Sequence, residues 1–178
     1  MHILITGVPG AGKSTLINKI LQQVKTPVFG FRTKKAEEDA DGNATVYIHP
    51  AVGEYTYSER NAVGLSSSKG AVAYPEIFES EGVKLLSGIP AGSVVLMDEL
   101  GFMESQAAKF CEMVMKVLNE PYYVIAAVKT MNTPFLESVR THKMGSVYLV
   151  TADNRDSLHD QIMTDLRRLD PASPLLNP

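Results

Sequence analysis

The chain has 178 residues, of which 44% are hydrophobic and 21% charged, and its formal net charge is −3 at pH 7. A chain of this size can bury one α/β core, so we expect a single domain over residues 1–170 and a C-terminal tail over residues 171–178. The slight negative charge argues against nucleic acid or an anionic membrane as a partner, and the lack of an apparent signal peptide or membrane span predicts a cytoplasmic protein, for which we favour a monomer.

The first predicted element is a strand that runs into a glycine-rich loop. Residues 2–6, HILIT, are apolar enough for a buried strand, and residues 13–24 carry apolar side chains at helical spacing. The loop between them, GVPGAGKST, fits the P-loop pattern G-x-x-x-x-G-K-[ST], in which backbone N–H groups and a helix N-terminus converge on phosphate oxygens. We therefore predict a site for nucleotide phosphates. Its predicted members are Gly7, Val8, Pro9, Gly10, Ala11, Gly12, Lys13, Ser14 and Thr15.

The last three residues of this loop have separate predicted roles. Lys13 is expected to bridge the β- and γ-phosphates of a nucleoside triphosphate as a catalytic residue, and the Ser14 hydroxyl is expected to bind Mg²⁺. Thr15 either contacts the α-phosphate or caps a turn, and the pattern favours neither role. The order of strand, loop and helix argues against the alternative interpretation, a flexible turn before a helix-starting serine.

A second strand is expected over residues 26–33, TPVFGFRT, followed by a charged excursion. Arg32 lies at the end of this strand, where it either reaches phosphate oxygens as a catalytic cation or is an ordinary charged edge residue. The excursion is predicted to form a β-hairpin with a turn at Asp41-Gly42.

Residues 54–70 are polar and rich in turn-forming residues, which predicts a surface hairpin and a mobile loop near the active edge of the sheet. Arg60 and Lys69 fall in this stretch and are candidates for the role of an arginine finger, although most loop cations are only solvated. A helix over residues 75–86 is expected next.

The segment SVVLMDELGFME, residues 93–104, carries the second chemical signal. An apolar strand that ends in an acid is typical of a Walker B strand, whose Asp98 is expected to hold Mg²⁺ through water opposite Ser14. Glu99 is placed to orient or deprotonate a water that attacks the γ-phosphate, with a salt-bridged strand-end acid as the alternative. If Glu99 lacks this role, Glu104 is the next acid to consider. The D-x-x-G pattern of switch GTPases is present, but no N-K-x-D motif supports guanine selectivity.

The remaining chain alternates between helices and strands. Helices are expected over residues 104–119, 134–140 and 154–169, and strands over residues 122–128 and 146–150. Strands separated by helices predict a three-layer α/β fold with a mostly parallel sheet, helices on both faces and a β-hairpin excursion after the second strand. Cys111 is expected to be a buried core thiol on the apolar face of a helix.

Asn154 and Arg155 open the last predicted helix. Asn154 is explained as a helix cap, whereas Arg155 is only partly explained by helix formation and is a candidate for stacking on the nucleotide base. The four histidines lack the spacing of zinc ligands, so Mg²⁺ is the only metal that the sequence predicts.

Five segments in order, GVPGAGKST, GFRT, VVLMDELGFME, PFLESVR and TADNRDSLHDQI, resemble the P-loop nucleoside-triphosphatase family first known from thermophiles, whose animal member is called cancer-related nucleoside-triphosphatase. The resemblance spans nearly the whole chain. It implies the P-loop NTPase fold and a small Mg²⁺-dependent enzyme that hydrolyses ATP, GTP and other nucleoside triphosphates to the diphosphate and phosphate. The chain departs from the family at SSSKGAVAYPE, where Lys69 is the candidate replacement for an arginine.

Two other function classes use the same loop. A small-molecule or nucleotide kinase needs an acceptor pocket and usually a lid with paired arginines, and the sequence contains no such cluster outside its last helix. A nucleotide-gated regulatory module keeps the loop and loses the catalytic carboxylate, whereas Glu99 is present. Hydrolysis is therefore favoured, while the preferred nucleotide and the cellular pathway stay open.

Overall fold

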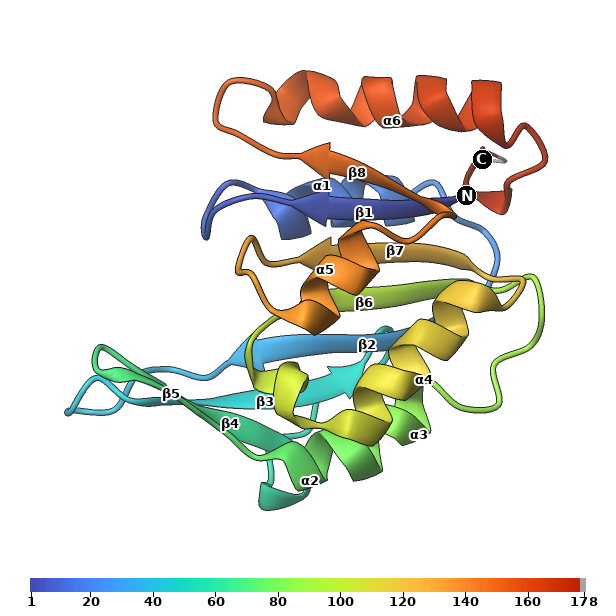
Figure 1. Ribbon diagram of the computed structural model, residues 1–178. Coiled ribbons are helices and arrows are strands. Elements are labelled where there is room, and N and C mark those ends of the chain that lie inside the picture. Colours follow the sequence, from blue (N-terminus) through green and yellow to red (C-terminus); the bar gives the residue numbers. More distant parts are fainter. Residues whose placement is uncertain (177–178) are drawn as a thin grey trace.

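Eight strands form one mixed sheet in the computed structural model, which describes residues 1–176 (Figure 1). The strands are β1 (His2–Thr6), β2 (Val28–Lys35), β3 (Ala44–Pro50), β4 (Ala62–Ser67), β5 (Gly70–Ala73), β6 (Val94–Leu100), β7 (Tyr123–Val128) and β8 (Gly145–Leu149). Their order in the sheet is β5-β4-β3-β2-β6-β7-β1-β8. The five strands from β2 to β8 in this order run parallel, and β3, β4 and β5 extend the sheet with antiparallel pairing.

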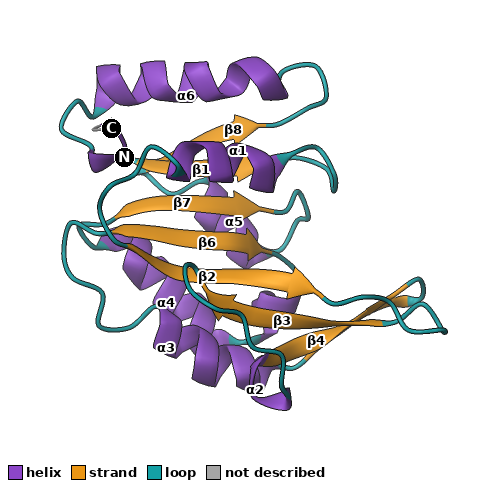
Figure 2. Cartoon of the chain, turned by 180° about the vertical axis from the view of Figure 1, so that it is seen from behind, coloured by secondary structure: helices purple, strands orange, loops and turns teal. Residues whose placement is uncertain are grey.

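Helices cover both faces of the sheet (Figure 2). They are α1 (Lys13–Leu21), α2 (Pro75–Ile77), α3 (Val83–Leu85), α4 (Ala108–Asn119), α5 (Pro134–Arg140) and α6 (Arg155–Leu169). α1 and α6 pack on one face, and α4, α5 and the segment from α2 to α3 pack on the other. This arrangement confirms the predicted three-layer α/β fold with a mostly parallel sheet. No helix within residues 1–176 is both long and apolar enough to cross a membrane.

β6 lies between β2 and β7 and is covered on both faces. Val94 and Leu96 face the core under α1 and α6, whereas Val95 and Met97 face the core under α4 and α5, because successive side chains of a strand alternate. A strand that is covered twice needs apolar side chains at every position, which explains the continuous run VVLM. The polar residues start at Asp98, towards the carboxyl end of the strand.

The predicted hairpin after the second strand is confirmed by the antiparallel pairing of β2 and β3. The Asp39 carboxylate accepts the backbone N–H of Asp41 at 2.9 Å and that of Asn43 at 2.8 Å. Gly42 has a φ of +75°, which residues with a side chain rarely adopt, so the turn depends on this glycine. The surface hairpin expected within residues 54–70 lies further along the chain as β4 and β5, and it extends the main sheet beyond β3.

The helix expected over residues 104–119 starts later, because α4 begins at Ala108. Residues 103–106 form a 3-10 turn, η3 (Met103–Gln106), in which the Glu104 carboxylate accepts the backbone N–H of Gly101 at 2.8 Å. Helical periodicity extends through this turn, but the buried hydrogen bond holds it in a different conformation. The predicted start of the helix was therefore wrong.

The helix expected over residues 75–86 contains a π-helical turn, η2 (Phe78–Gly82), between α2 and α3. A Cβ atom on Gly82 would lie 2.7 Å from the ring of Phe110 on α4. Glycine at this position lets the two helical segments approach closely, which seals the core on this face of the sheet.

The segment predicted as a C-terminal tail packs against the domain through residue 176. Leu175, in a short 3-10 turn, η4 (Pro174–Leu176), is fully buried in the core under α1 and α6. Residues 177–178 lie outside the described part of the chain. The division of the chain at residue 170 stays a prediction.

His2, at the start of β1, is fully buried. Its Nδ1 accepts the Val124 N–H at 3.4 Å and its Nε2 lies 2.9 Å from the Leu118 carbonyl oxygen, so the environment fits the ring with its proton on Nε2. Burial lowers the pKa of His2, and the hydrogen bond to Leu118 raises it by a smaller amount. The N-terminal ammonium and His142 lower it further.

His49, on β3, is 1% exposed and stacks on Tyr55 with ring centroids 4.4 Å apart. Within residues 1–176, neither ring nitrogen of His49 has a hydrogen-bond partner. Burial lowers the pKa of His49, and the nearby charge of Lys34 lowers it as well. Protonation of this ring would therefore place an unpaired charge inside the fold.

We expect the contribution of the two buried histidines to the free energy of unfolding to decrease as the pH falls below about 6.5, the ordinary pKa of histidine. Glu104, whose pKa burial raises to about 7, contributes in the opposite sense, so the histidine contribution is measured as a difference between two proteins that both keep Glu104. Both histidines have a lower pKa in the folded chain, so the unfolded chain takes up protons first and the stabilisation is lost as pH falls through the folded values. His49→Phe keeps a stacked ring and removes one titrating group, so it should flatten this dependence. Urea unfolding between about pH 8 and about pH 5.5 measures the effect, and identical pH profiles for both proteins would contradict it.

Candidate active site

The P-loop and the carboxyl ends of β2, β6 and β7 meet at one cavity of about 860 Å³. Parallel strands end at the same edge of a sheet, so residues that follow different strands gather there. One end of the cavity, the phosphate end, is lined by Pro9, Gly10, Gly12, Lys13, Ser14 and Thr15. Thus most of the predicted P-loop residues face a common space.

The P-loop is shaped by its glycines and contacted by its own lysine. A Cβ atom on Gly7 would lie 2.6 Å from the Val150 carbonyl oxygen, and Gly12 has a φ of +105° at the start of α1. Lys13 is 8% exposed, and its Nζ donates to the carbonyl oxygens of Gly7 at 3.0 Å and Val8 at 3.3 Å. The loop therefore holds the Lys13 ammonium against its own backbone, at the phosphate end of the cavity.

The two predicted metal ligands lie together. Ser14 Oγ donates to Asp98 Oδ1 at 3.4 Å. Asp98 Oδ2 accepts from Arg32 Nη1 at 2.7 Å, and Arg32 Nη2 donates to Asn18 Oδ1 at 2.7 Å. Burial raises the pKa of Asp98, and the Arg32 guanidinium lowers it. Arg32 is buried behind Asp98 and does not line the cavity, so the structure does not bring it to the phosphate end.

The Ser14 hydroxyl and the Asp98 carboxylate form a pair of oxygen ligands that suits Mg²⁺. Neighbouring ligands of an octahedral Mg²⁺ at about 2.1 Å stand about 3 Å apart. The 3.4 Å between Ser14 Oγ and Asp98 Oδ1 is close to this spacing. Within residues 1–176, no group of three or more His, Cys, Asp or Glu side chains could hold a metal ion. The site therefore fits an ion that takes its other ligands from water and phosphate.

Glu99 lies between two ammonium groups. Its Oε2 is 3.5 Å from Lys13 Nζ, and its Oε1 is 3.2 Å from Lys129 Nζ. Thr33 Oγ1 accepts the Glu99 backbone N–H at 3.3 Å, which connects this residue to β2. Sequence reasoning missed Lys129, although its position directly after the apolar run of β7 was a signal that it ends at the same edge as Asp98.

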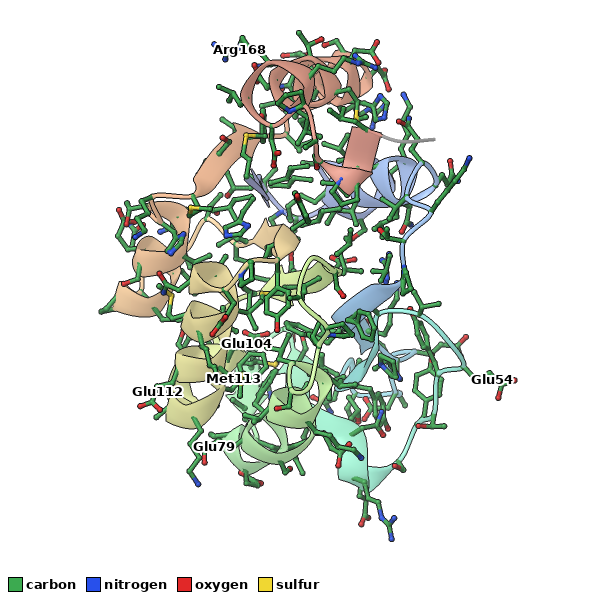
Figure 3. The ribbon with its side chains drawn as sticks, turned by 90° about the vertical axis from the view of Figure 1, so that its right-hand side faces the viewer. Glu54, Glu79, Glu104, Glu112, Met113 and Arg168 are labelled. Atoms are coloured by element: carbon green, nitrogen blue, oxygen red, sulfur yellow. The ribbon has the colours of Figure 1, made fainter. Side chains whose placement is uncertain are left out.

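Glu104 is the buried acid of the site. Figure 3 shows it inside the molecule, whereas Glu79 and Glu112 lie at the outer side of the helices. Burial raises the pKa of Glu104 to about 7, against the opposing effect of the Gly101 N–H that it accepts. Cys111, on α4, is only half-buried, contrary to expectation, and its thiol donates to the carbonyl oxygen of Glu104 in η3 at 3.2 Å.

The two residues at the start of the last helix have different surroundings. Asn154 Oδ1 accepts the Thr151 N–H at 2.8 Å, so its side chain shapes the preceding loop instead of capping α6. Arg155 is exposed, and its Cδ lies 3.7 Å from the position of a Cβ on Gly12. This contact places Arg155 beside the P-loop, and its role towards a base stays a prediction.

Arg60 and Lys69 are both exposed and do not line the cavity. Arg60 lies in η1 (Glu59–Asn61) before β4, and Lys69 lies in the turn between β4 and β5. The structure therefore does not bring either candidate finger residue to the phosphate end.

A second part of the cavity was missed by sequence reasoning. Its wall includes Val46 from β3, Ala71 from β5, Phe78 from η2 and Met103 from η3. We call this part the hairpin end, because β3, β4 and β5 lie on this side of β2. No local pattern joins these residues, since four separate elements supply them.

Comparisons with known proteins show the family of the chain. The model of the NTPase family matches residues 2–163. The nucleoside-triphosphatase THEP1 of Thermotoga petrophila is 32% identical over 170 residues, which cover 94% of this chain and 93% of that protein. The cancer-related nucleoside-triphosphatase of Homo sapiens is 30% identical over 183 residues, which cover 92% of this chain and 95% of that protein.

Two solved structures have the same fold. The solution structure of a human cancer-related nucleoside triphosphatase has a TM-score of 0.64 and 25% identity, and the match covers 94% of this chain and 98% of that one. The crystal structure of THEP1 from the hyperthermophile Aquifex aeolicus has a TM-score of 0.68 and 24% identity, and the match covers 94% of this chain and 100% of that one.

Proposed function

Because the chain belongs to the NTPase family, we propose that it is a Mg²⁺-dependent nucleoside-triphosphatase that converts ATP, GTP and other nucleoside triphosphates to the diphosphate and phosphate. Family membership supports hydrolysis of nucleoside triphosphates, and the residues of the site support the need for Mg²⁺ and the range of substrates. The observation that carries the proposal is the Glu99 carboxylate, which lies 3.5 Å from Lys13 at the phosphate end of the cavity.

In the proposed mechanism, the P-loop binds the triphosphate before any bond changes. Backbone N–H groups of the loop surround the phosphate oxygens, and the N-terminus of α1 adds its positive dipole end. Lys13 exchanges its contacts with the Gly7 and Val8 carbonyl oxygens for the β- and γ-phosphates. Mg²⁺ bound by Ser14 and Asp98 supplies positive charge that stabilises the charge developing on the phosphate oxygens.

Glu99 is proposed to orient the attacking water and to accept its proton. A carboxylate next to Asp98 in the chain can face the γ-phosphate while Asp98 remains a metal ligand. Arg32 is proposed as a positioning residue, because its contact with Asp98 Oδ2 leaves Oδ1 turned towards Ser14. Arg155 is proposed to lie along the nucleoside, since it is exposed beside Gly12.

Removal of the metal should stop the reaction. We expect EDTA to lower the hydrolysis rate by at least about a hundredfold, because the ion stabilises the transition state by several kcal/mol, and added Mg²⁺ or Mn²⁺ to restore it. Phosphate release with and without EDTA measures the effect, and a circular dichroism spectrum in EDTA controls for unfolding. Full activity in EDTA would mean that Ser14 and Asp98 do not form a metal site.

The proposed range of substrates gives a second test. The residues that line the phosphate end face phosphates, and a stacking arginine accepts any base, so kcat/KM for ATP, GTP, CTP and UTP should agree within about tenfold, or about 1.4 kcal/mol. Product analysis by ³¹P NMR for each nucleotide with Mg²⁺ should show the diphosphate and inorganic phosphate. A preference of about a thousandfold for one base would require a specific base pocket and would contradict the proposal.

A further inference from the structure

The cavity continues past the part that a nucleoside triphosphate and an attacking water occupy in the proposed mechanism. In that mechanism the phosphates bind at the P-loop and the nucleoside lies along Arg155, whose Cδ is 3.7 Å from the position of a Cβ on Gly12. The hairpin end lies in the opposite direction, because β3, β4 and β5 follow β2 on the side of the sheet away from β1. Glu99 stands between the two ends and lines the same cavity.

The wall of the hairpin end is suited to an apolar ring. Val46, Ala71 and Met103 present hydrocarbon and sulfur to the cavity, Phe78 is fully buried within this wall, and Phe102 remains 37% exposed at its margin. Such side chains contribute nothing to binding phosphate groups or a water, but they gain from contact with a flat apolar ligand. With the donor nucleoside along Arg155, as in the proposed mechanism, neither the phosphates nor the attacking water uses this wall.

The charges near the hairpin end favour a neutral ligand. Lys35 Nζ already pairs with Glu38 at 2.7 Å, and Lys129 Nζ pairs with Glu99 at 3.2 Å. An anionic ligand would have to break these ion pairs or remain without a positively charged partner. A neutral molecule with a hydroxyl group can instead direct its O–H to the Glu99 carboxylate and place its ring on the apolar wall.

We propose that the hairpin end is a phosphoryl-acceptor subsite for a small neutral molecule that carries both an aromatic ring and an alcohol hydroxyl, such as a nucleoside. The proposal rests on the same bound triphosphate as the proposed hydrolysis. The hydroxyl oxygen of the acceptor attacks the γ-phosphorus and forms a new P–O bond, while the bond between the γ-phosphorus and the β,γ-bridging oxygen breaks. The nucleoside diphosphate leaves, and the hydroxyl proton passes to Glu99. The products are a phosphate monoester and the diphosphate.

Transfer can be measured with ATP labelled in its γ-phosphate. The full chain is incubated with Mg²⁺, labelled ATP and adenosine, guanosine, cytidine or uridine at about 1 mM, near the upper range of common KM values, and the products are separated by thin-layer chromatography. We expect saturable formation of labelled nucleoside monophosphate with at least one of the four, and a matching decrease in labelled inorganic phosphate, because the acceptor takes the place of the water.

Two variants on β5 locate the acceptor. Ala71→Phe fills the hairpin end and should lower transfer by at least about tenfold while basal hydrolysis stays within about twofold. Val72→Phe is the matched control, since Val72 is 57% exposed and does not line the cavity, so both activities should be kept. Equal transfer by Ala71→Phe and the unmodified chain would contradict the location.

The remaining outcomes separate this proposal from the proposed function. If hydrolysis proceeds and the label never enters a nucleoside, the acceptor subsite is wrong and the hydrolase stands. If parallel incubations with AMP, GMP, CMP or UMP give labelled diphosphate while the four nucleosides stay unlabelled, the wall binds an anion and the neutral acceptor is wrong. If neither hydrolysis nor transfer occurs, the proposed function has failed as well.

Discussion

Glu99→Gln lowers the rate of nucleoside-triphosphate hydrolysis by about 10²–10⁴-fold, equivalent to about 3–5 kcal/mol in the activation barrier. The amide keeps the size of the side chain and its ability to bond a water, but it cannot accept the proton. Glu99 also pairs with Lys13 and Lys129, so its neutral replacement leaves both ammonium groups free for phosphate. Nucleotide affinity should therefore stay constant or increase while the chemical step slows.

Single-turnover phosphate release together with equilibrium binding of Mg²⁺–ATP separates these effects. Glu54→Gln is a matched control, because Glu54 is exposed and points away from the body of the molecule (Figure 3). Equal rates for Glu99→Gln and the unmodified chain would move the water-activating role to Glu104, which lines the cavity together with Asp98 and Glu99. A parallel loss of affinity and rate would instead make Glu99 part of the metal site.

Lys13→Met should reduce kcat/KM by at least about 10²–10³-fold, because it removes the cation that stabilises the charge on the transferred phosphate. Methionine retains most of the side-chain length and apolar stem in a position that is 8% exposed, so the fold should persist. Steady-state kinetics with Mg²⁺–ATP and a thermal unfolding curve measure the two effects separately.

Lys69→Met provides the control for Lys13→Met, because Lys69 is exposed in the turn between β4 and β5 and lies outside the cavity. It should keep activity within about twofold, as is usual for a solvated surface charge. Unchanged hydrolysis by Lys13→Met would refute the phosphate site. A large loss with Lys69→Met would show instead that this turn reaches the nucleotide during turnover.

The parts of the site that could be predicted are those encoded by short local patterns. Gly7, Gly12, Lys13 and Ser14 occupy fixed positions in one loop, and flanking strand and helix patterns support them. Asp98 could be placed opposite Ser14 because parallel strands bring their carboxyl ends to one edge. The alternation of strand and helix patterns along the chain is also enough to predict the layers of the fold, although it does not give the strand order.

The parts that could not be predicted depend on contacts between distant segments. The sequence is equally compatible with Arg32 as a phosphate ligand or as an edge residue. Its hydrogen bonds to Asp98 and Asn18 place it behind Asp98 instead. Lys129 reaches Glu99 through the neighbouring positions of β6 and β7. The start of α4 was misplaced because one buried hydrogen bond from Gly101 to Glu104 outweighs helical periodicity.

The strand order has a consequence for synthesis of the chain on the ribosome. β1 precedes the other strands in the chain, but its two neighbours in the sheet are β7 and β8, which end at Val128 and Leu149. A nascent chain that stops before Tyr123 leaves β1 without either neighbour, whereas the hairpin of β2 and β3 closes from adjacent segments. Pairing across so many residues is slow, and an unpaired apolar strand is prone to aggregate. The P-loop directly follows β1, so it is among the last parts of the molecule to be held by a fully paired strand.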